Sequence, residues 1–191
     1  MERWHSKEEH RTGIYFNPNH TDFYNAVNHS QIYVDKTELI QYTNSVLFGE
    51  QKYICVSRPR RFGKSLTLNM LQHYYDVRTK DKFDSLFGDL YIGKHPTKDR
   101  NSYLVIKLNF SGITGELHNY RKSLDEHCRI VFDYFCDVYA DYLPEGIKEK
   151  MAEKDGVVSQ FEYLFTECAR INQKIYLFID EYDHFTNTIL S

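Results

Sequence analysis

A phosphate-binding loop is the clearest chemical signal in this sequence. The general pattern is GxxxxGK followed by Ser or Thr, in which a glycine lets the backbone approach phosphate, a lysine contacts the outer phosphates and a hydroxyl binds Mg²⁺. Gly63, Lys64 and Ser65 occupy these three positions, whereas Arg58 stands where the first glycine is expected. This change is tolerable because backbone N–H groups at a helix N-terminus make the main phosphate contacts. We therefore predict that the loop holds a nucleoside triphosphate.

The same loop residues would also suit roles that need no phosphate. In this alternative, the Gly-Lys-Ser tripeptide at residues 63–65 only begins a helix. The nearby arginines would then be solvated loop charges, and would not contact phosphate, a partner subunit or an acidic residue. The position of the tripeptide favours phosphate binding, because an apolar run precedes it and helix-spaced apolar residues follow it. The predicted phosphate-contacting residues are Arg58, Pro59, Arg60, Arg61, Phe62, Gly63, Lys64, Ser65 and Leu66.

An acidic pair ends the apolar run at residues 174–180. In phosphate-loop enzymes an aspartate at this place binds Mg²⁺, and the glutamate after it orients or deprotonates the attacking water. Asp180 is therefore a predicted metal ligand together with Ser65, and Glu181 is predicted to be catalytic together with Lys64. Acids that follow a strand are usually ordinary loop residues, so this prediction depends on the phosphate loop elsewhere in the chain.

Three apolar runs, at residues 52–57, 102–110 and 174–180, are predicted to form buried strands of a largely parallel sheet. Strands that alternate with helices predict an α/β domain whose sheet is covered on both faces. Apolar spacing predicts helices from residue 63, from about 117 to 142 with Pro144 at the end, and over about 157–171. A short helix is predicted near residues 21–27, a short strand at 32–34, and a helix capped by Asp35 or Thr37 through Tyr42.

Composition limits the classes of function. The net charge of −3 and the pI of about 6.3 argue against a protein that mainly coats nucleic acid. A charged N-terminus and the lack of a run of roughly 20 apolar residues predict a cytoplasmic protein. The four cysteines show no CxxC pair and are expected to be small buried residues, and the scattered histidines give no zinc motif. The 16 Tyr and 13 Phe indicate a well-filled aromatic core.

Three segments together carry a resemblance to a known family. Residues 33–40, 57–66 and 179–183 resemble the motifs of the bacterial AAA-ATPase-like family, which is similar to AAA+ and related signal-transduction ATPases. The resemblance covers about residue 14 to the C-terminus, and in this family an arginine at position 58 is usual. It implies ATP and Mg²⁺ as ligands and a P-loop, three-layer α/β/α fold with Walker A and Walker B motifs. Asp35 and Lys36 match a family motif of unclear role, with helix capping plus a surface lysine as the alternative.

The resemblance also implies features that this sequence does not contain. Family members have a further strand after the acidic pair, a polar sensor residue, an arginine finger and often a restriction-endonuclease-like domain, whereas eight residues follow Asp183. Unpaired central strands would each leave buried polar groups unsatisfied at roughly 1–3 kcal/mol per group. We therefore expect a chain truncated after the Walker B motif, with direct pairing of two strands or completion by another chain as alternatives.

The expected organisation is an irregular segment over residues 1–31 and a P-loop ATPase-like domain over residues 32–191, incomplete at its C-terminal end. The expected function is an ATP-binding, Mg²⁺-dependent switch that hydrolyses ATP if the missing part is supplied. Alternatives are a non-hydrolysing nucleotide-binding or protein-interaction module, and the ATPase part of a nuclease-linked protein. The expected partners are ATP and a protein or a second copy, with nucleic acid only through a missing domain and no membrane.

Overall fold

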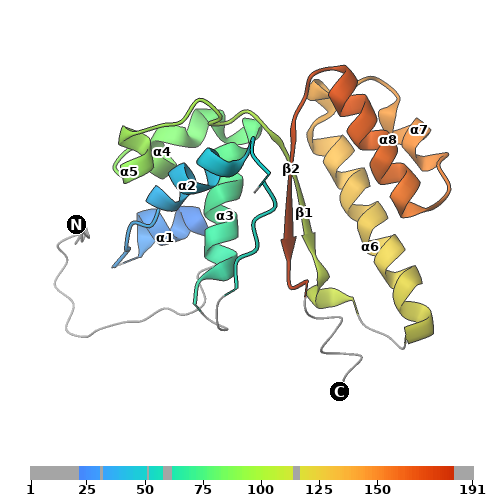
Figure 1. The fold of residues 1–191 in the computed structure, drawn as a ribbon, viewed down its shortest axis with the longest axis horizontal. Helices are drawn as coiled ribbons and strands as arrows, with labels where there is room; N and C mark the ends of the chain where they lie inside the picture. Colours follow the sequence, from blue (N-terminus) through green and yellow to red (C-terminus); the bar gives the residue numbers. More distant parts are fainter. Residues whose placement is uncertain (1–21, 31, 51, 58–61, 114–116, 183–191) are drawn as a thin grey trace. The chain divides into compact units, whose positions relative to one another are not determined.

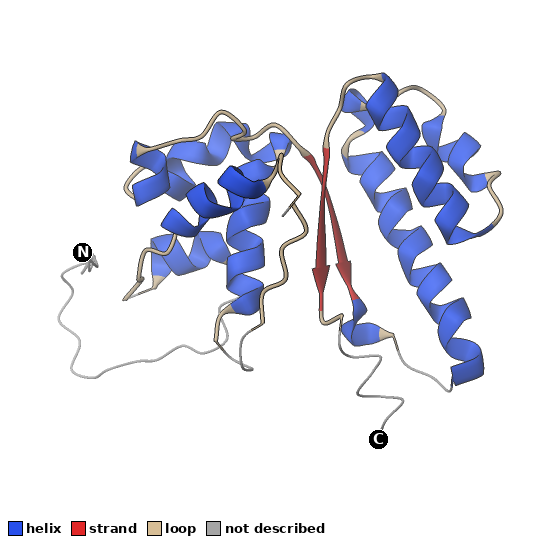
Figure 2. Cartoon of the chain, viewed as in Figure 1, coloured by secondary structure: helices blue, strands red, loops and turns tan. Residues whose placement is uncertain are grey.

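The protein is described by a computed structural model that covers residues 22–30, 32–50, 52–57, 62–113 and 117–182. Its contacts divide the chain into two compact units, Met1–Asn101 and Ser102–Ser191. Among the described residues, the helices and strands of the first unit are all helices, whereas the second unit combines helices with two strands (Figures 1 and 2). The predicted division into residues 1–31 and residues 32–191 stays a prediction.

The first unit consists of short helices and the longer helix α3. Its elements are α1 (Phe23–His29), α2 (Glu38–Val46), α3 (Lys64–Tyr75), a 3-10 helix (Val77–Lys82), α4 (Phe83–Phe87) and α5 (Tyr91–Lys94). Helix α1 contacts both α3 and α4, while α2 contacts α5 (Figure 1). The helices predicted near residues 21–27, after residue 37 and from residue 63 are confirmed as α1, α2 and α3.

Aromatic side chains fill the core of the first unit. Phe23, Tyr74 and Phe87 are completely buried. The ring centroid of Phe87 lies 5.0 Å from that of Phe23 and 5.5 Å from that of Tyr74. Met70, Leu71 and Tyr74 of α3 are buried because they recur at helical spacing on one face, as the sequence predicts. Ring pairs of this kind contribute about 0.5–1.5 kcal/mol each beyond the area that they bury.

Two predicted strands of the first unit are not formed. Residues 52–57 are not a strand, and Tyr53 is 85 % exposed. Cys55 is exposed as well, so the prediction that it is a buried apolar residue is wrong. An apolar run becomes a strand only when another strand pairs with it, and the sheet of the described residues contains β1 (Leu104–Asn109) and β2 (Ile175–Asp180) alone. At residues 32–34, where a strand was also predicted, Val34 forms a single bridge.

A parallel two-stranded sheet organises the second unit. Its strands, β1 and β2, pair in one continuous register, from Leu104 opposite Ile175 to Asn109 opposite Asp180. The strands predicted at residues 102–110 and 174–180 are therefore confirmed. Parallel strands need a long crossover connection. Here the crossover contains 3-10 helices at Phe110–Gly112 and Ala140–Tyr142 and the helices α6 (Leu117–Val138), α7 (Ile147–Ala152) and α8 (Gly156–Arg170).

The helices of the second unit form a layer beside its sheet. Helix α6 packs against β1, and α8 packs against α6 and α7 (Figure 1). Leu104, Ile106 and Leu108 of β1 are buried as their alternation predicts. The predicted helix at residues 157–171 is confirmed as α8. The long predicted helix is confirmed as α6, although it ends at Val138 and the chain tightens into a 3-10 turn before Pro144.

The mixture of helices and a small parallel sheet is compatible with the predicted α/β class. The finer expectation, a three-layer P-loop fold, stays a prediction. Within the described parts of the chain, every helix is too short or too polar to cross a bilayer.

Candidate nucleotide-binding site

The predicted phosphate loop leads into the N-terminus of α3. Gly63 is the N-cap of this 12-residue helix and has the left-handed backbone angles φ 77° and ψ 22°. The carbonyl oxygen of Gly63 accepts the first helical hydrogen bond, from the Thr67 N–H at 2.9 Å. Glycine suits this position because side-chain-bearing residues are strained at positive φ. A Cβ atom added at Gly63 would meet no atom of the described residues within 4 Å.

The first turn of α3 contains three predicted contact residues. Lys64, Ser65 and Leu66 are half-buried there. The N–H groups of a first helical turn lack partners inside the helix, and the helix dipole makes this end attractive to anions. Phe62, also predicted to contact phosphate, is 65 % exposed. The remaining predicted contact residues, Arg58, Pro59, Arg60 and Arg61, lie outside the described residues.

The predicted acidic pair stands at the carboxyl end of β2. Asp180 is the last residue of the strand and is 6 % exposed. Its Oδ1 accepts a hydrogen bond from the Glu181 N–H at 3.1 Å. Glu181 has φ 54°, which is unusual for a residue with a side chain and costs on the order of 1–3 kcal/mol. Strained backbone of this kind clusters at functional sites, where the surrounding structure holds a side chain in a fixed direction.

Sequence reasoning missed Asn109, the neighbour of Asp180. Asn109 ends β1 and lies in register with Asp180, so the two side chains stand on the same face of the sheet at the same edge. The Asn109 Oδ1 accepts a hydrogen bond from the Ser111 N–H at 2.9 Å, which fixes the direction of the amide. The signal was present in the sequence, because Asn109 is a polar residue near the end of the apolar run at residues 102–110, but the pairing of the two runs was needed to recognise it.

The predicted site residues belong to both units. Gly63, Lys64 and Ser65 are in the first unit, whereas Asp180 and Glu181 are in the second. The sequence-based expectation that these groups act on one nucleotide stays a prediction.

Asp35 has a structural role in the first unit. Its Oδ1 accepts hydrogen bonds from the Thr37 N–H at 2.8 Å and the Thr37 hydroxyl at 2.7 Å, and its Oδ2 accepts one from the Tyr91 N–H at 2.7 Å. The Thr37 Oγ1 in turn accepts a hydrogen bond from the Ile92 N–H at 3.1 Å. Asp35 thus joins the start of α2 to the start of α5, while Lys36 is exposed. This arrangement agrees with the alternative of helix capping plus a surface lysine.

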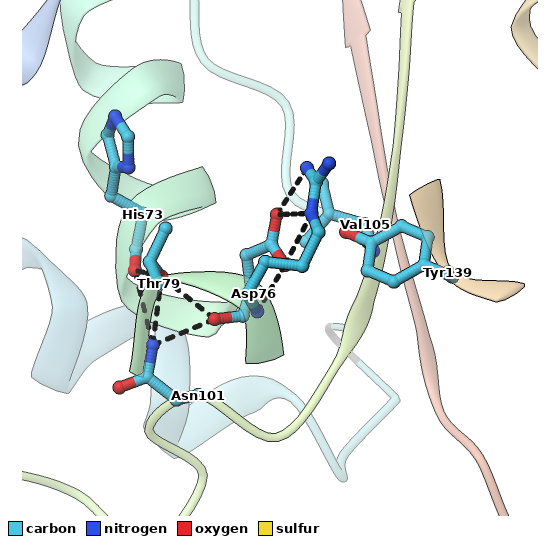
Figure 3. A network of polar contacts seen from close by, with 7 residues as sticks. His73, Asp76, Thr79, Asn101, Val105 and Tyr139 are labelled. Atoms are coloured by element: carbon cyan, nitrogen blue, oxygen red, sulfur yellow. Dashed lines mark hydrogen bonds and ion pairs between the residues drawn. The ribbon is translucent and has the colours of Figure 1, made fainter. Parts of the chain in front are cut away.

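A second polar network closes the C-terminal end of α3 (Figure 3). The Asn101 Nδ2 donates hydrogen bonds to the Asp76 carbonyl oxygen at 2.8 Å and to the Thr79 Oγ1 at 3.0 Å. The Asp76 carboxylate forms an ion pair with Arg78 at 2.7 Å. Burial is the largest cause of the lowered pKa of His73, and the buried His73 Nδ1 has no hydrogen-bond partner among the described residues. These contacts hold the end of the helix that begins with the predicted phosphate loop.

The buried cysteines lack the properties of nucleophiles. Burial raises the pKa of Cys136 to about 12 and that of Cys168 to about 11, and it also raises the pKa of Cys128. A thiol with a raised pKa is protonated at neutral pH and reacts slowly. The prediction of small buried residues is therefore confirmed for these three cysteines. No cluster of three or more His, Cys, Asp or Glu side chains suited to a metal ion occurs in the described part of the chain.

Comparison with known proteins decides the family. The sequence model of the AAA-ATPase-like family, described as "Predicted AAA-ATPase", matches residues 19–191. The chain belongs to this family. Membership of the AAA-ATPase-like family indicates a nucleotide-binding, ATPase-like role. No curated protein and no solved structure matches the chain.

Proposed function

We propose that the chain binds ATP with Mg²⁺ and acts as a nucleotide-driven switch. The observation that carries this proposal is the N-terminus of α3, where Gly63 adopts a left-handed conformation directly before Lys64 and Ser65. A helix that begins at such a glycine offers its first N–H groups to phosphate. Membership of the AAA-ATPase-like family supports adenine nucleotides as the ligand.

The residues of the chain fit a bound MgATP. Mg²⁺ usually takes one or two protein ligands together with phosphate oxygens and water, and the Ser65 hydroxyl and the Asp180 carboxylate are ligands of the right type. No described residue lies within 4 Å of a Cβ built at Gly63, and Lys64 would contact the outer phosphate oxygens. Residues Arg58 to Phe62 are proposed to add further phosphate contacts. Bound Mg²⁺ would supply positive charge to the phosphate oxygens.

Glu181 is proposed to orient and deprotonate the water that attacks the terminal phosphate. Glu181 has a backbone φ of 54°, and its N–H donates a hydrogen bond to the Asp180 carboxylate. A change in the contacts of Asp180, the proposed Mg²⁺ ligand, would therefore shift the position of the Glu181 side chain. Asn109, in register with Asp180, is proposed to help hold this water or the acidic pair. Release of the terminal phosphate would then change the contacts of Glu181, which gives the switch its signal.

Nucleotide titration tests the binding part of this proposal. We expect Lys64→Ala to weaken the binding of a fluorescent ATP analogue in the presence of Mg²⁺ by about tenfold or more, because a charge-assisted contact is lost. Lys82→Ala is the matched control, since Lys82 is exposed on the 3-10 helix of the same unit. Equal affinity in the wild-type, Lys64→Ala and Lys82→Ala chains would refute the proposed phosphate site.

Phosphate release tests the enzymatic part. If the chain hydrolyses ATP, we expect Glu181→Gln to slow turnover by about 10²–10⁴-fold while ATP binding is retained, because the general base is removed. Binding without any turnover in the wild-type chain would instead identify a non-hydrolysing nucleotide-binding module.

A further inference from the structure

Strand β2 of the second unit has one edge whose backbone groups lack partners. It pairs with β1 on its other side, where the Leu104 N–H donates to the Lys174 carbonyl oxygen at 2.8 Å. Backbone groups of successive strand residues point to alternate sides, so Lys174 and every second residue after it face β1. The N–H and C=O groups of Ile175, Leu177 and Ile179 face away from β1. Within the described part of the chain, these groups have no hydrogen-bond partner.

The unpaired groups of these three residues, called the β2 edge below, have the properties of a pairing surface. Proteins usually protect an edge strand with charged residues, prolines or bulges. From Ile175 to Ile179 the strand contains no charge and no proline, its ladder with β1 is unbroken, and Ile179 is 42 % exposed. On the outer side of β1, by contrast, the Val105 N–H donates to the Tyr139 hydroxyl at 2.9 Å. The β2 edge is therefore the better template for a further strand.

The charges at the two ends of β2 favour a second copy of the chain in antiparallel orientation. The exposed Lys174 precedes the apolar run, and Asp180 ends it. When two copies pair antiparallel about Leu177, Lys174 of each copy lies opposite Asp180 of the other. Directly opposite residues of unlike charge stabilise a ladder, whereas like charges destabilise it. A parallel pair in register would bring the two lysines together and the two aspartates together, so the charges select the antiparallel pair.

The same register also satisfies the backbone. Antiparallel pairing about Leu177 places Ile175 opposite Ile179 of the other copy and Leu177 opposite Leu177. Each of these pairs exchanges two N–H···O=C bonds, which gives about six hydrogen bonds across the interface. A shift by two residues would leave part of the β2 edge unpaired and would place Lys174 opposite Phe178 or Tyr182. One register therefore pairs both the charges and the backbone groups.

We propose that two copies of this chain associate through the β2 edge, as an antiparallel pair centred on Leu177. The product is a four-stranded sheet in the order β1, β2, β2, β1. Each copy offers the same edge to the other, so the contact is two-fold symmetric and closes as a dimer. The association covers the exposed side chain of Ile179 and needs no nucleotide.

Sedimentation equilibrium of the 191-residue chain without nucleotide tests the association. We expect a concentration-dependent equilibrium between monomer and dimer. Leu177→Pro removes an N–H group from the β2 edge of both copies and leaves the bonds to β1 intact, because this N–H faces away from β1. The dissociation constant should rise at least about tenfold. Leu177→Val is the matched control: it keeps the N–H group and an apolar side chain, and should dimerise within about threefold of the wild type.

Cysteine cross-linking tests the register without a proline. The background is Cys55→Ser, because Cys55 is exposed and could form a disulfide itself. Leu177→Cys should form a disulfide between copies on mild oxidation, since directly opposite Cα atoms are about 5.5 Å apart, within the range of a disulfide. Ile179→Cys is the control on the same edge. In this register its two copies are four residues apart along the strands, about 14 Å, and should stay unlinked. Circular dichroism verifies that each variant is folded.

Any of four results would overturn the proposal: a monomer up to the solubility limit, open-ended aggregates in place of a discrete dimer, a dimer that Leu177→Pro does not weaken, or cross-linking of Ile179→Cys as fast as that of Leu177→Cys. A monomer would mean that other residues of the chain cover the β2 edge. Lys64→Ala should dimerise as the wild type does, so the result is independent of the proposed ATP site.

Discussion

Replacement of Asp35 tests whether this residue of the family motif acts through structure or through the nucleotide. Its carboxylate accepts three hydrogen bonds, two from Thr37 and one from the Tyr91 N–H. In Asp35→Ala all three donors lose their partner, and Thr37, which is 0 % exposed, is left with an unsatisfied N–H group. The packing of the start of α2 against the start of α5 should therefore weaken.

The size of this loss follows from the contacts. A hydrogen bond to a charged group is worth about 1.5–3 kcal/mol, but water can replace part of these bonds because Asp35 is half-buried. We expect Asp35→Ala to lower the free energy of unfolding by about 2–3 kcal/mol in total. With a urea dependence of about 1–3 kcal/mol per molar, the urea midpoint would fall by about 1–2 M. Asp35→Asn should cost less, since one acceptor remains in place while an N–H₂ group faces one of the donors.

Urea unfolding followed by circular dichroism measures this loss. Lys36→Ala is the control, because Lys36 is the exposed neighbour and should change stability by no more than about 0.5 kcal/mol. Below its unfolding transition, Asp35→Ala should bind MgATP as the wild type does. A wild-type urea midpoint combined with a large loss of MgATP affinity would refute the structural role and would place Asp35 at the nucleotide.

Three further substitutions test the roles of single residues. Gly63→Ala should lower stability by about 1–2 kcal/mol through positive-φ strain alone, because no described residue lies within 4 Å of the added Cβ, and an unchanged urea midpoint would contradict the left-handed start of α3. Burial lowers the pKa of His73 below its usual 6.5, so the stability that comes from the neutral imidazole is present above that pH and is lost as the pH falls. The drop in urea midpoint from about pH 7.5 to about pH 5.5 should therefore be smaller in His73→Gln than in the wild type. An equal drop in both would exclude His73 as a source of the pH dependence. Asn109→Ala should slow phosphate release more than it weakens ATP binding, whereas Asn109→Asp, which keeps the acceptor for the Ser111 N–H, should preserve the fold of the strand end.

Local sequence patterns predicted the helices, whose hydrogen bonds are local, and the two strands whose pairing partners are also apolar runs. Helices α3, α6 and α8 follow from apolar spacing, and β1 and β2 follow from apolar runs that find each other as neighbours. Residues 52–57 have an equally apolar pattern but no ladder, because strand formation depends on a partner that the run itself does not encode.

Long-range contacts limited the prediction of individual roles. Asp35 was recognised as a possible cap, but its bond to the Tyr91 N–H joins residues 56 positions apart and could not be inferred from spacing. Asn109 gained its meaning only when its register with Asp180 was known.

Lys64 and Asp180 are proposed to act on the same MgATP, and the proposed function depends on this convergence. A double-mutant cycle with Lys64→Ala, Asp180→Ala and the double variant, measured as MgATP affinity, tests it most directly. We predict that each single change weakens binding and that the two losses are coupled by at least about 1 kcal/mol, as for residues that share one ligand. Fully additive losses, or no loss from Asp180→Ala, would contradict a shared nucleotide site.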